Sequence, residues 1–121
     1  MYFGAENPNS YTIKASASTN CILSSGQIGP VFFNNIIFEG SNSDAIEIGG
    51  SNTFTFDNIT VRQAGGNGLS APSHQYLSVS NSHFHDINNN GCWTTVGSSY
   101  ANIDNCLVEN VGLDLTLTKG G

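Results

Sequence analysis

Glu47 and Trp93 are the two side chains of this sequence whose types best fit contact with a sugar. An exposed tryptophan ring stacks on the apolar face of a sugar, and a carboxylate accepts hydrogen bonds from sugar hydroxyls. Carbohydrate contact is therefore the chemistry that this pair offers, provided that the fold brings both residues to one surface. The alternative is that a neighbouring segment covers Trp93 and that Glu47 is only a solvated charge.

His83 and His85 lie two residues apart, so a β-strand would project both imidazoles from the same face. Together with Glu109 or Asp86, two imidazoles have the chemistry to bind a divalent metal. Arg62 is expected beside His85 and opposes a metal, because it adds positive charge. We therefore predict a surface ladder of alternating charges and no metal site, with His83, His85 and Glu109 as the candidate ligands should a metal bind.

The acidic residues give little support to a calcium site or to a catalytic site. Only Asp57 and Asp104 align in one acidic column, whereas Ca²⁺ takes about six to eight oxygen ligands. We expect no cofactor, and Ca²⁺ is the one ion left open. Glycoside hydrolysis needs two carboxylates across a cleft, and of Glu47 and Asp44 the second lies at a predicted corner. No nucleophile–base pair is visible, so the sequence leaves open whether the protein is an enzyme.

A repeat of 23 or 24 residues organises the positions of these side chains. Asparagine recurs in four similar segments at intervals of 23, 23 and 24 residues: Asn35, Asn58, Asn81 and Asn105. A second column of inward pairs keeps a period of 23 residues: Ile46/Ile48, Leu69/Ala71, Cys92/Thr94 and Leu115/Leu117. Columns that share one period indicate a solenoid, in which each repeat lies on the previous one.

Three stretches of each repeat alternate between apolar and polar residues, which predicts three short β-strands. Stacking in register places equivalent residues about 4.8 Å apart and joins the inward columns into one core. Glu47 and Trp93 then lie two coils, or about 10 Å, apart. We predict an all-β fold, a right-handed parallel β-helix with three short strands per coil and about four and a half coils of 23–24 residues.

The recurring asparagines are predicted to form a structural ladder at the bend between the second and third strands of each coil. We expect the amides of Asn35, Asn58, Asn81 and Asn105 to point inward and to bond to one another and to the backbone. Asn58-Ile59-Thr60 matches an N-glycosylation acceptor, but a buried Asn58 excludes glycosylation there.

The residue pattern of these repeats resembles that of a known family. The segments that carry the likeness are Asn34-Asn35-Ile36, Asp57-Asn58-Ile59-Thr60-Val61 and Asp104-Asn105-Cys106-Leu107-Val108. They are similar to the right-handed parallel β-helix repeats of the pectin-lyase-like superfamily, of the type found in large secreted bacterial proteins. The resemblance covers about residues 31–117.

The resemblance implies a pool of activities and a place to look for a site. Polysaccharide lyases, glycoside hydrolases, epimerases, adhesins and tailspike-like proteins share this fold. In such proteins the substrate groove often crosses the outward face of the first sheet. That expectation implies a carbohydrate-binding face with these residues: Glu47, Ser70, Trp93, Thr95 and His74.

Composition excludes several other classes of function. The net charge is −6, and the three basic residues, Lys14, Arg62 and Lys119, lie far apart. Nucleic-acid binding needs several clustered Lys or Arg residues, and an anionic membrane surface needs the same, so we expect neither partner. No apolar run approaches the roughly 20 residues of a membrane helix. The three cysteines lack metal-type spacing and are interpreted as small buried apolar side chains.

We divide the chain into residues 1–30, a lead-in with an incomplete first coil, and residues 31–121, coils that end without a cap. The function expected is that of an extracellular or cell-surface β-helix segment of a polysaccharide-associated protein, which binds glycan or serves as a scaffold. Two alternatives stay open. Copies of the chain could stack end to end into fibres, because an uncapped solenoid exposes unpaired backbone. The chain could also be a fragment of a polysaccharide lyase or glycoside hydrolase.

Overall fold

The computed structural model of the chain describes residues 18–24, 26, 29–50, 53–72, 76–94, 100–114 and 116. These residues form twelve β-strands that pair in parallel and stack into a solenoid, as predicted. In these ranges no helix is long and apolar enough to cross a membrane.

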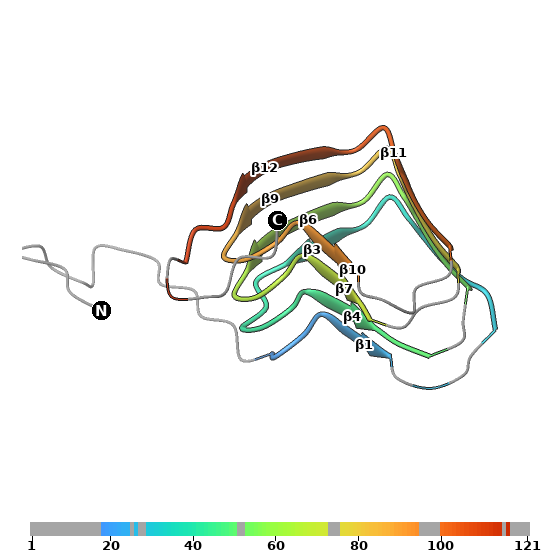
Figure 1. Cartoon of the computed structure of the whole chain (residues 1–121), viewed down its shortest axis with the longest axis horizontal. Helices are drawn as coiled ribbons and strands as arrows, with labels where there is room; N and C mark the ends of the chain where they lie inside the picture. Colours follow the sequence, from blue (N-terminus) through green and yellow to red (C-terminus); the bar gives the residue numbers. More distant parts are fainter. Residues whose placement is uncertain are drawn as a thin grey trace, which may run out of the picture.

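Three four-stranded sheets form the sides of the solenoid (Figure 1). The first sheet contains β1 (Ile22–Ser24), β4 (Ile46–Ile48), β7 (Leu69–Ala71) and β10 (Cys92–Thr94). The second sheet contains β2 (Val31–Asn34), β5 (Thr53–Asp57), β8 (Tyr76–Ser80) and β11 (Tyr100–Asp104). The third sheet contains β3 (Ile37–Glu39), β6 (Thr60–Ala64), β9 (His83–Ile87) and β12 (Leu107–Val111). In Figure 1 the third sheet lies at the upper left, the second at the right and the first below.

The strand registers confirm the predicted columns. Ile46 pairs with Leu69, and Leu69 pairs with Cys92, each one repeat further along the chain. Three complete turns separate β1 from β10, which lie at opposite edges of the first sheet. β1 precedes the expected boundary at residue 31 and already pairs with β4. Leu115 and Leu117, on which part of the predicted length rested, lie outside the described residues.

Side chains that point inward form one continuous apolar core. Along β5 the residues alternate between half-buried and buried, and Phe54 and Phe56 are only 1% and 0% exposed. The Phe56 ring stacks on that of Phe33 one coil earlier, with centroids 5.2 Å apart. Burial of a phenylalanine contributes about 1.5–3 kcal/mol, so each coil depends on the next for its stability.

A left-handed residue turns the chain at each bend between the second and third sheets. Asn35, Asn58, Asn81 and Asn105 have φ of 57°, 52°, 51° and 49°. Asparagine is among the few residues that adopt this conformation at low cost, because its short polar side chain bonds locally. The repeated asparagine therefore has a backbone role that the period alone does not show.

The asparagine ladder exists, but the prediction that it points inward is wrong. All four side chains are exposed. Asn58 donates to Asn35, and Asn105 Nδ2 donates to Asn81 Oδ1 at 2.7 Å. Asn81 Nδ2 donates instead to Asp57 Oδ1, also at 2.7 Å, so the carboxylate takes one place in the ladder.

The left-handed bend explains the outward direction. The residue after each asparagine occupies the inward slot, as in Ile59 (2% exposed) and Ser82 (3% exposed). Asn58 is exposed, so the prediction that burial excludes its glycosylation is wrong.

A second ladder, at the corner before the first sheet, is the more buried one. Asp44 Oδ1 accepts hydrogen bonds from the backbone N and the Nδ2 of Asn67, at 2.7 and 3.1 Å. Asn67 Oδ1 in turn accepts from the backbone N and the Nδ2 of Asn90, at 3.2 and 3.0 Å. Buried backbone N–H groups need hydrogen-bond acceptors, and this ladder supplies them to the backbone N–H groups of Asn67 and Asn90 at the corners of their coils.

A second left-handed column, which the sequence pattern did not reveal, interrupts the third sheet. Gly40, Gln63, Asp86 and Asn110 have φ of 80°, 56°, 55° and 51°. The register of β6 with β9 passes over this position, pairing Arg62 with His85 and then Ala64 with Ile87. One residue intervenes on each strand, so the column bends neighbouring strands together and leaves their register unchanged.

The cysteines do not all share the predicted environment. Cys21 is exposed, whereas Cys92 and Cys106 are half-buried and pack against the core. Burial, together with the nearby Cys106, raises the pKa of the Cys92 thiol to about 12. Cys92 therefore fits the prediction of a small apolar side chain packed against the core, whereas the exposure of Cys21 shows that the prediction is wrong there.

Candidate functional site

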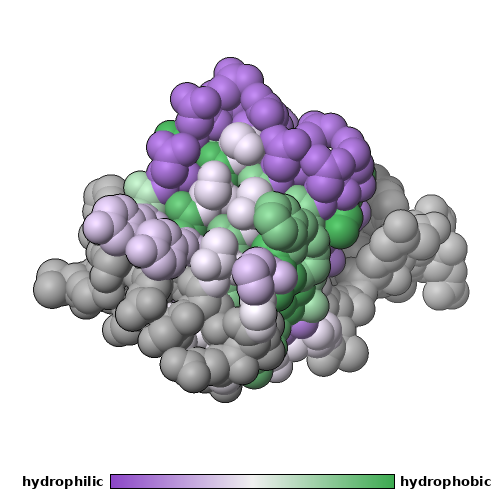
Figure 2. Space-filling model, turned by 90° about the vertical axis from the view of Figure 1, so that its right-hand side faces the viewer, coloured by the Kyte–Doolittle hydropathy of each residue, from purple (hydrophilic) through white to green (hydrophobic). Residues whose placement is uncertain are grey.

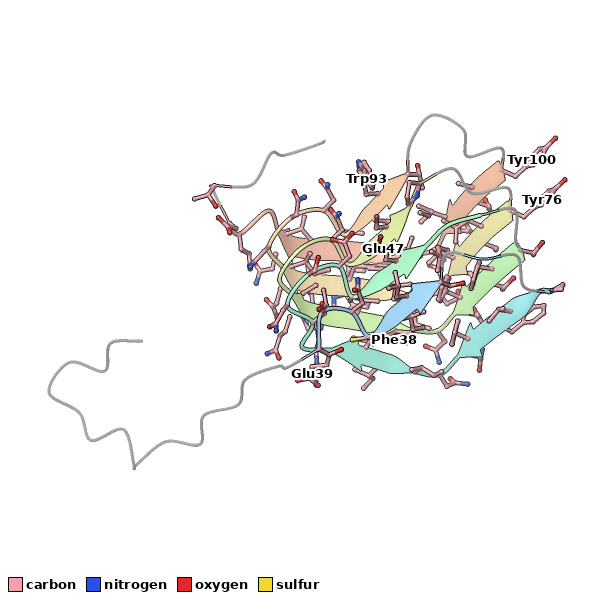
Figure 3. All side chains as sticks on the ribbon, turned by 90° about the horizontal axis from the view of Figure 1, so that it is seen from below. Phe38, Glu39, Glu47, Tyr76, Trp93 and Tyr100 are labelled. Carbon is pink, nitrogen blue, oxygen red and sulfur yellow. The ribbon has the colours of Figure 1, made fainter. Side chains whose placement is uncertain are left out.

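Glu47 and Trp93 lie on the outward face of the first sheet, in the register that the repeat predicted. Ser70 pairs with Glu47 on one side and with Trp93 on the other, so two coils separate the pair. Figure 3 shows both side chains on the same side of the coil. The column begins at Leu23, which pairs with Glu47 and is 65% exposed.

The packing of this column limits what it offers to a ligand. Trp93 is 36% exposed, but Ser70 is only 3% exposed. Glu47 Oε2 accepts a hydrogen bond from Asn20 Nδ2 at 3.2 Å, which ties it to the corner of the first coil. Thr95 and His74, the other residues predicted for this face, lie outside the described residues. Carbohydrate binding on the first sheet therefore stays a prediction.

The third sheet carries the predicted charges on its outward face. The His83 and His85 rings lie side by side with centroids 4.4 Å apart. His83 Nε2 lies 2.9 Å from Glu109 Oε1, and Arg62 donates to Glu39 at 2.9 Å. In the part of the chain that the structure describes, no group of three or more His, Cys, Asp or Glu residues is arranged to hold a metal.

One further pair belongs to this charged surface. His85 Nδ1 lies 2.7 Å from Asp86 Oδ2, and Asn110 Nδ2 donates to Asp86 Oδ1 at 2.9 Å. The bond with His85 and then the bond from Asn110 lower the pKa of the Asp86 carboxyl. Solvent screens these half-exposed pairs, so they fit a solvated ladder better than a reactive centre.

The outward face of the second sheet carries an acidic edge. Asp57 accepts hydrogen bonds from Asn81, Ser80 and Asn34, at 2.7, 2.9 and 2.8 Å. The bonds from Asn81 and Ser80 are the main causes that lower the pKa of Asp57. Asp104 stands in the same column, beyond Ser80. Asp57 and Asp104 therefore align in one column, as predicted. The Asp57 carboxylate already accepts hydrogen bonds from three side chains of the protein.

A shallow groove lies on the same outward face, at the start of the strands. Its volume is about 360 Å³, near the lower end of the range for ligand pockets. Three successive strands, β5, β8 and β11, each contribute their first three residues to its lining. The six outward-facing members, which we call the tyrosine groove, are Thr53, Thr55, Tyr76, Ser78, Tyr100 and Asn102.

Tyr76 and Tyr100 form the aromatic end of the tyrosine groove. Their rings stack with centroids 4.9 Å apart and planes 6° from parallel. They are 50% and 64% exposed, and Figure 3 shows both rings projecting away from the coil in the same direction. Figure 2 looks onto this side of the molecule, where a hydrophilic upper edge borders paler and apolar atoms below.

The family model for the right-handed beta helix region matches residues 20–119. The chain belongs to this family. Comparisons with curated proteins and with solved structures found no match.

The tyrosine groove lies on the second sheet of this β-helix, whereas the resemblance favoured the first sheet. The signal for it was nevertheless in the repeat. Tyr76 and Tyr100 immediately precede Leu77 and Ala101, which are column partners, so both tyrosines had to share an outward column. The sugar contacts predicted from the sequence lie on the first sheet or in the loop that follows β7, so the groove was not among them.

The described lining of the groove carries groups that can stack and form hydrogen bonds. Its lining contains hydroxyls, one amide and aromatic edges, but no carboxylate, imidazole, amine or thiol. Among the described lining residues the titratable groups are the phenols of Tyr76 and Tyr100, and no carboxylate or imidazole lines the groove beside them. Stacking and hydrogen bonding to a neutral hydroxylated ligand need no titratable group.

Proposed function

We propose that the chain is a glycan-binding scaffold, a rigid β-helix segment of an extracellular, polysaccharide-associated protein. The single observation that carries this proposal is the tyrosine groove, where a stacked aromatic pair adjoins a row of hydroxyls. Sugars are amphipathic in the same way, because their C–H faces pack on aromatic rings and their hydroxyls take hydrogen bonds.

The rigidity of the platform supports this proposal. Each residue of the groove belongs to a strand that is paired on at least one side, and the neighbouring inward residues Phe54 and Leu77 are 1% and 3% exposed. Side chains held by a packed sheet lose little further conformational freedom when a ligand binds. A flat, preordered face suits an extended polymer better than a small ligand that must be enclosed.

The experiment is affinity electrophoresis of the whole chain through gels that contain a panel of soluble polysaccharides. Tyr100→Ala should weaken retention roughly tenfold, because an aromatic anchor contributes about 1–2 kcal/mol to an interface. Phe32→Ala is the matched control, since Phe32 is an aromatic residue on the same sheet, 73% exposed and outside the groove lining.

Trp93→Ala distinguishes the two candidate faces in the same gels. Loss of retention in this variant but not in Tyr100→Ala assigns binding to the first sheet. Unchanged mobility of the wild-type chain across the whole panel contradicts the proposal.

A second candidate function is end-to-end association, and one observation favours it. Every residue of β11 and β12 is exposed, although their inward positions are apolar. Ile103 and Val108 are 47% and 46% exposed, whereas their partners one coil earlier, Val79 and Phe84, are 0% exposed. An open apolar strand edge favours pairing with another strand.

Light scattering across a concentration series tests this second function. Val108→Lys should reduce any association, because it places a charge on the open edge. Glu109→Lys, an exposed position on the outward face of the same strand, is the control. A single species of monomer mass at high concentration eliminates the idea.

A further inference from the structure

We infer that the tyrosine groove selects uncharged polysaccharides and discriminates against polyuronates. This inference rests on the proposed function, since it names the class of glycan that the same groove takes. Charge complementarity on the second sheet is what carries it.

The lining of the groove is neutral at every outward position. Its side chains carry only hydroxyls, an amide and aromatic rings: Thr53, Thr55, Tyr76, Ser78, Tyr100 and Asn102. Each polar group among them can both donate and accept a hydrogen bond, as sugar hydroxyls do. A carboxylate, by contrast, only accepts, and it demands charged or strongly aligned donors to replace its water.

The nearest charges on this face are negative. Asp57 lies two residues beyond Thr55 on β5, and Asp104 lies two residues beyond Asn102 on β11. Two residues along a parallel strand span about 6.6 Å, so both carboxylates border the groove. Hydrogen bonds from Asn81 and Ser80 lower the pKa of Asp57, so this carboxylate keeps its charge across the neutral range. A polyuronate in the groove would place further carboxylates beside these two.

The positive charge of the described residues is placed elsewhere. Arg62 is the only Lys or Arg within the described ranges. It stands on the outward face of the third sheet and is held by Glu39 at 2.9 Å. It therefore offers no counter-charge to a uronate that lies on the second sheet. Neutralisation of the uronate, on which acidic-glycan recognition depends, is missing from this part of the molecule.

The test compares neutral and acidic polymers of similar length on the whole chain. Hydroxyethyl cellulose, xyloglucan and galactomannan serve as neutral probes, and polygalacturonate and alginate as acidic ones. At low ionic strength the wild-type chain should bind at least one neutral polymer roughly tenfold or more tighter than either polyuronate. Added salt should narrow that gap, because screening weakens the repulsion.

A charge placed in the groove should reverse part of the preference. Asn102→Lys adds a cation between Tyr100 and Asp104 and should strengthen polyuronate retention several-fold. Leu107→Lys adds the same charge on the outward face of the third sheet and should leave it unchanged; Leu107 is 54% exposed, so the substitution is tolerated. Thermal melts monitored by circular dichroism verify that both variants fold.

The outcomes separate the inference from the proposal beneath it. Wild-type binding to a polyuronate as tight as to the neutral polymers overturns the inference and leaves glycan binding intact. A preference for a cationic amino-sugar polymer such as chitosan over every neutral probe overturns it as well. Equal effects of Asn102→Lys and Leu107→Lys overturn the assignment of the preference to the groove. Failure to retain the wild-type chain on any polymer overturns both.

Discussion

Tyr76 and Tyr100 occupy one outward column of the second sheet, and their rings stack at a centroid distance of 4.9 Å. That distance is the spacing of neighbouring strands, which is about 4.7–4.9 Å. Residues one coil apart are therefore held at the separation that aromatic rings prefer for offset stacking. The backbone sets this contact, so the two rings are aligned before any ligand arrives.

The tyrosine pair should be measurably coupled in stability. Aromatic pairs contribute about 0.5–1.5 kcal/mol beyond their burial. We expect a coupling free energy of that size from a double-mutant cycle with Tyr76→Ala and Tyr100→Ala, read from urea unfolding. A cycle that pairs Tyr76→Ala with Phe32→Ala should show none, because these residues stand in different columns. A coupling near zero for the tyrosines contradicts the stacked arrangement.

Phe56→Ala should strongly destabilise the solenoid. Phe56 is 0% exposed and stacks on both Phe33 and Phe54. Removal of a buried phenylalanine costs about 3–5 kcal/mol, through lost transfer energy and the cavity left behind. Phe32 directly precedes Phe33 in β2 and is 73% exposed, so Phe32→Ala should change the free energy of unfolding by under about 0.5 kcal/mol. Similar denaturation midpoints for the two variants are incompatible with the described core.

Gly68→Ala should destabilise the corner before the first sheet. A Cβ at Gly68 would lie 2.5 Å from the backbone oxygen of Gly91 and 2.7 Å from Ile87 Cδ1. The oxygen belongs to the next coil and cannot move without breaking its pairing, so we expect a loss of about 1–3 kcal/mol. Gly26→Ala is the matched control, because nothing lies within 4 Å of a Cβ there. Calorimetry of both variants measures the difference, and equal melting temperatures contradict the close approach of the coils.

Substitutions at Asn58 should separate backbone strain from ladder bonding. Its φ is 52°, where a β-branched residue is strongly disfavoured and glycine is not. We expect Asn58→Val to lose about 2 kcal/mol or more, from strain and from the lost bond to Asn35. Asn58→Gly should lose only about 1 kcal/mol, because it removes the ladder bond but keeps the conformation. Urea unfolding gives both values, and a glycine variant no more stable than the valine variant argues against the left-handed bend.

Asp57 should contribute to the acid sensitivity of the protein. Hydrogen bonds from Asn81 and Ser80 lower its folded pKa below the ordinary value of 3.8. A carboxyl with a depressed folded pKa adds stability above its unfolded pKa and loses it as the pH falls through the folded value. Asp57→Asn should therefore show a smaller drop in unfolding free energy between about pH 7 and about pH 2.5.

Urea titrations at several pH values measure this difference. Thr55→Ser, a change without a titratable group on the same strand, should follow the wild-type pH dependence. A drop of the same size in Asp57→Asn and in the wild-type chain contradicts the assigned role of Asp57.

The sequence by itself determined the repeat and its register. Inward residues such as Ile46 and Leu69 keep one period because a core column accepts only apolar side chains of suitable size. This constraint acts on residue type, so it is visible in the sequence. The same period placed Glu47 two coils from Trp93 and set His83 beside His85 on one face. Period and alternation are local properties, so they can be read without coordinates.

Only the tertiary structure decided the direction of the bends and the location of the groove. A period does not tell whether Asn58 points inward or outward, because that depends on a single left-handed φ. Nor does it show that Ser70 is buried while Tyr76 and Tyr100 stand in the open, since exposure depends on what the neighbouring coils and corners cover. The repeat predicts that Tyr76 and Tyr100 share an outward column, because columns follow from the period. Their exposure, which makes the column a groove, depends on the packing of the whole coil and was therefore decided only by the tertiary structure.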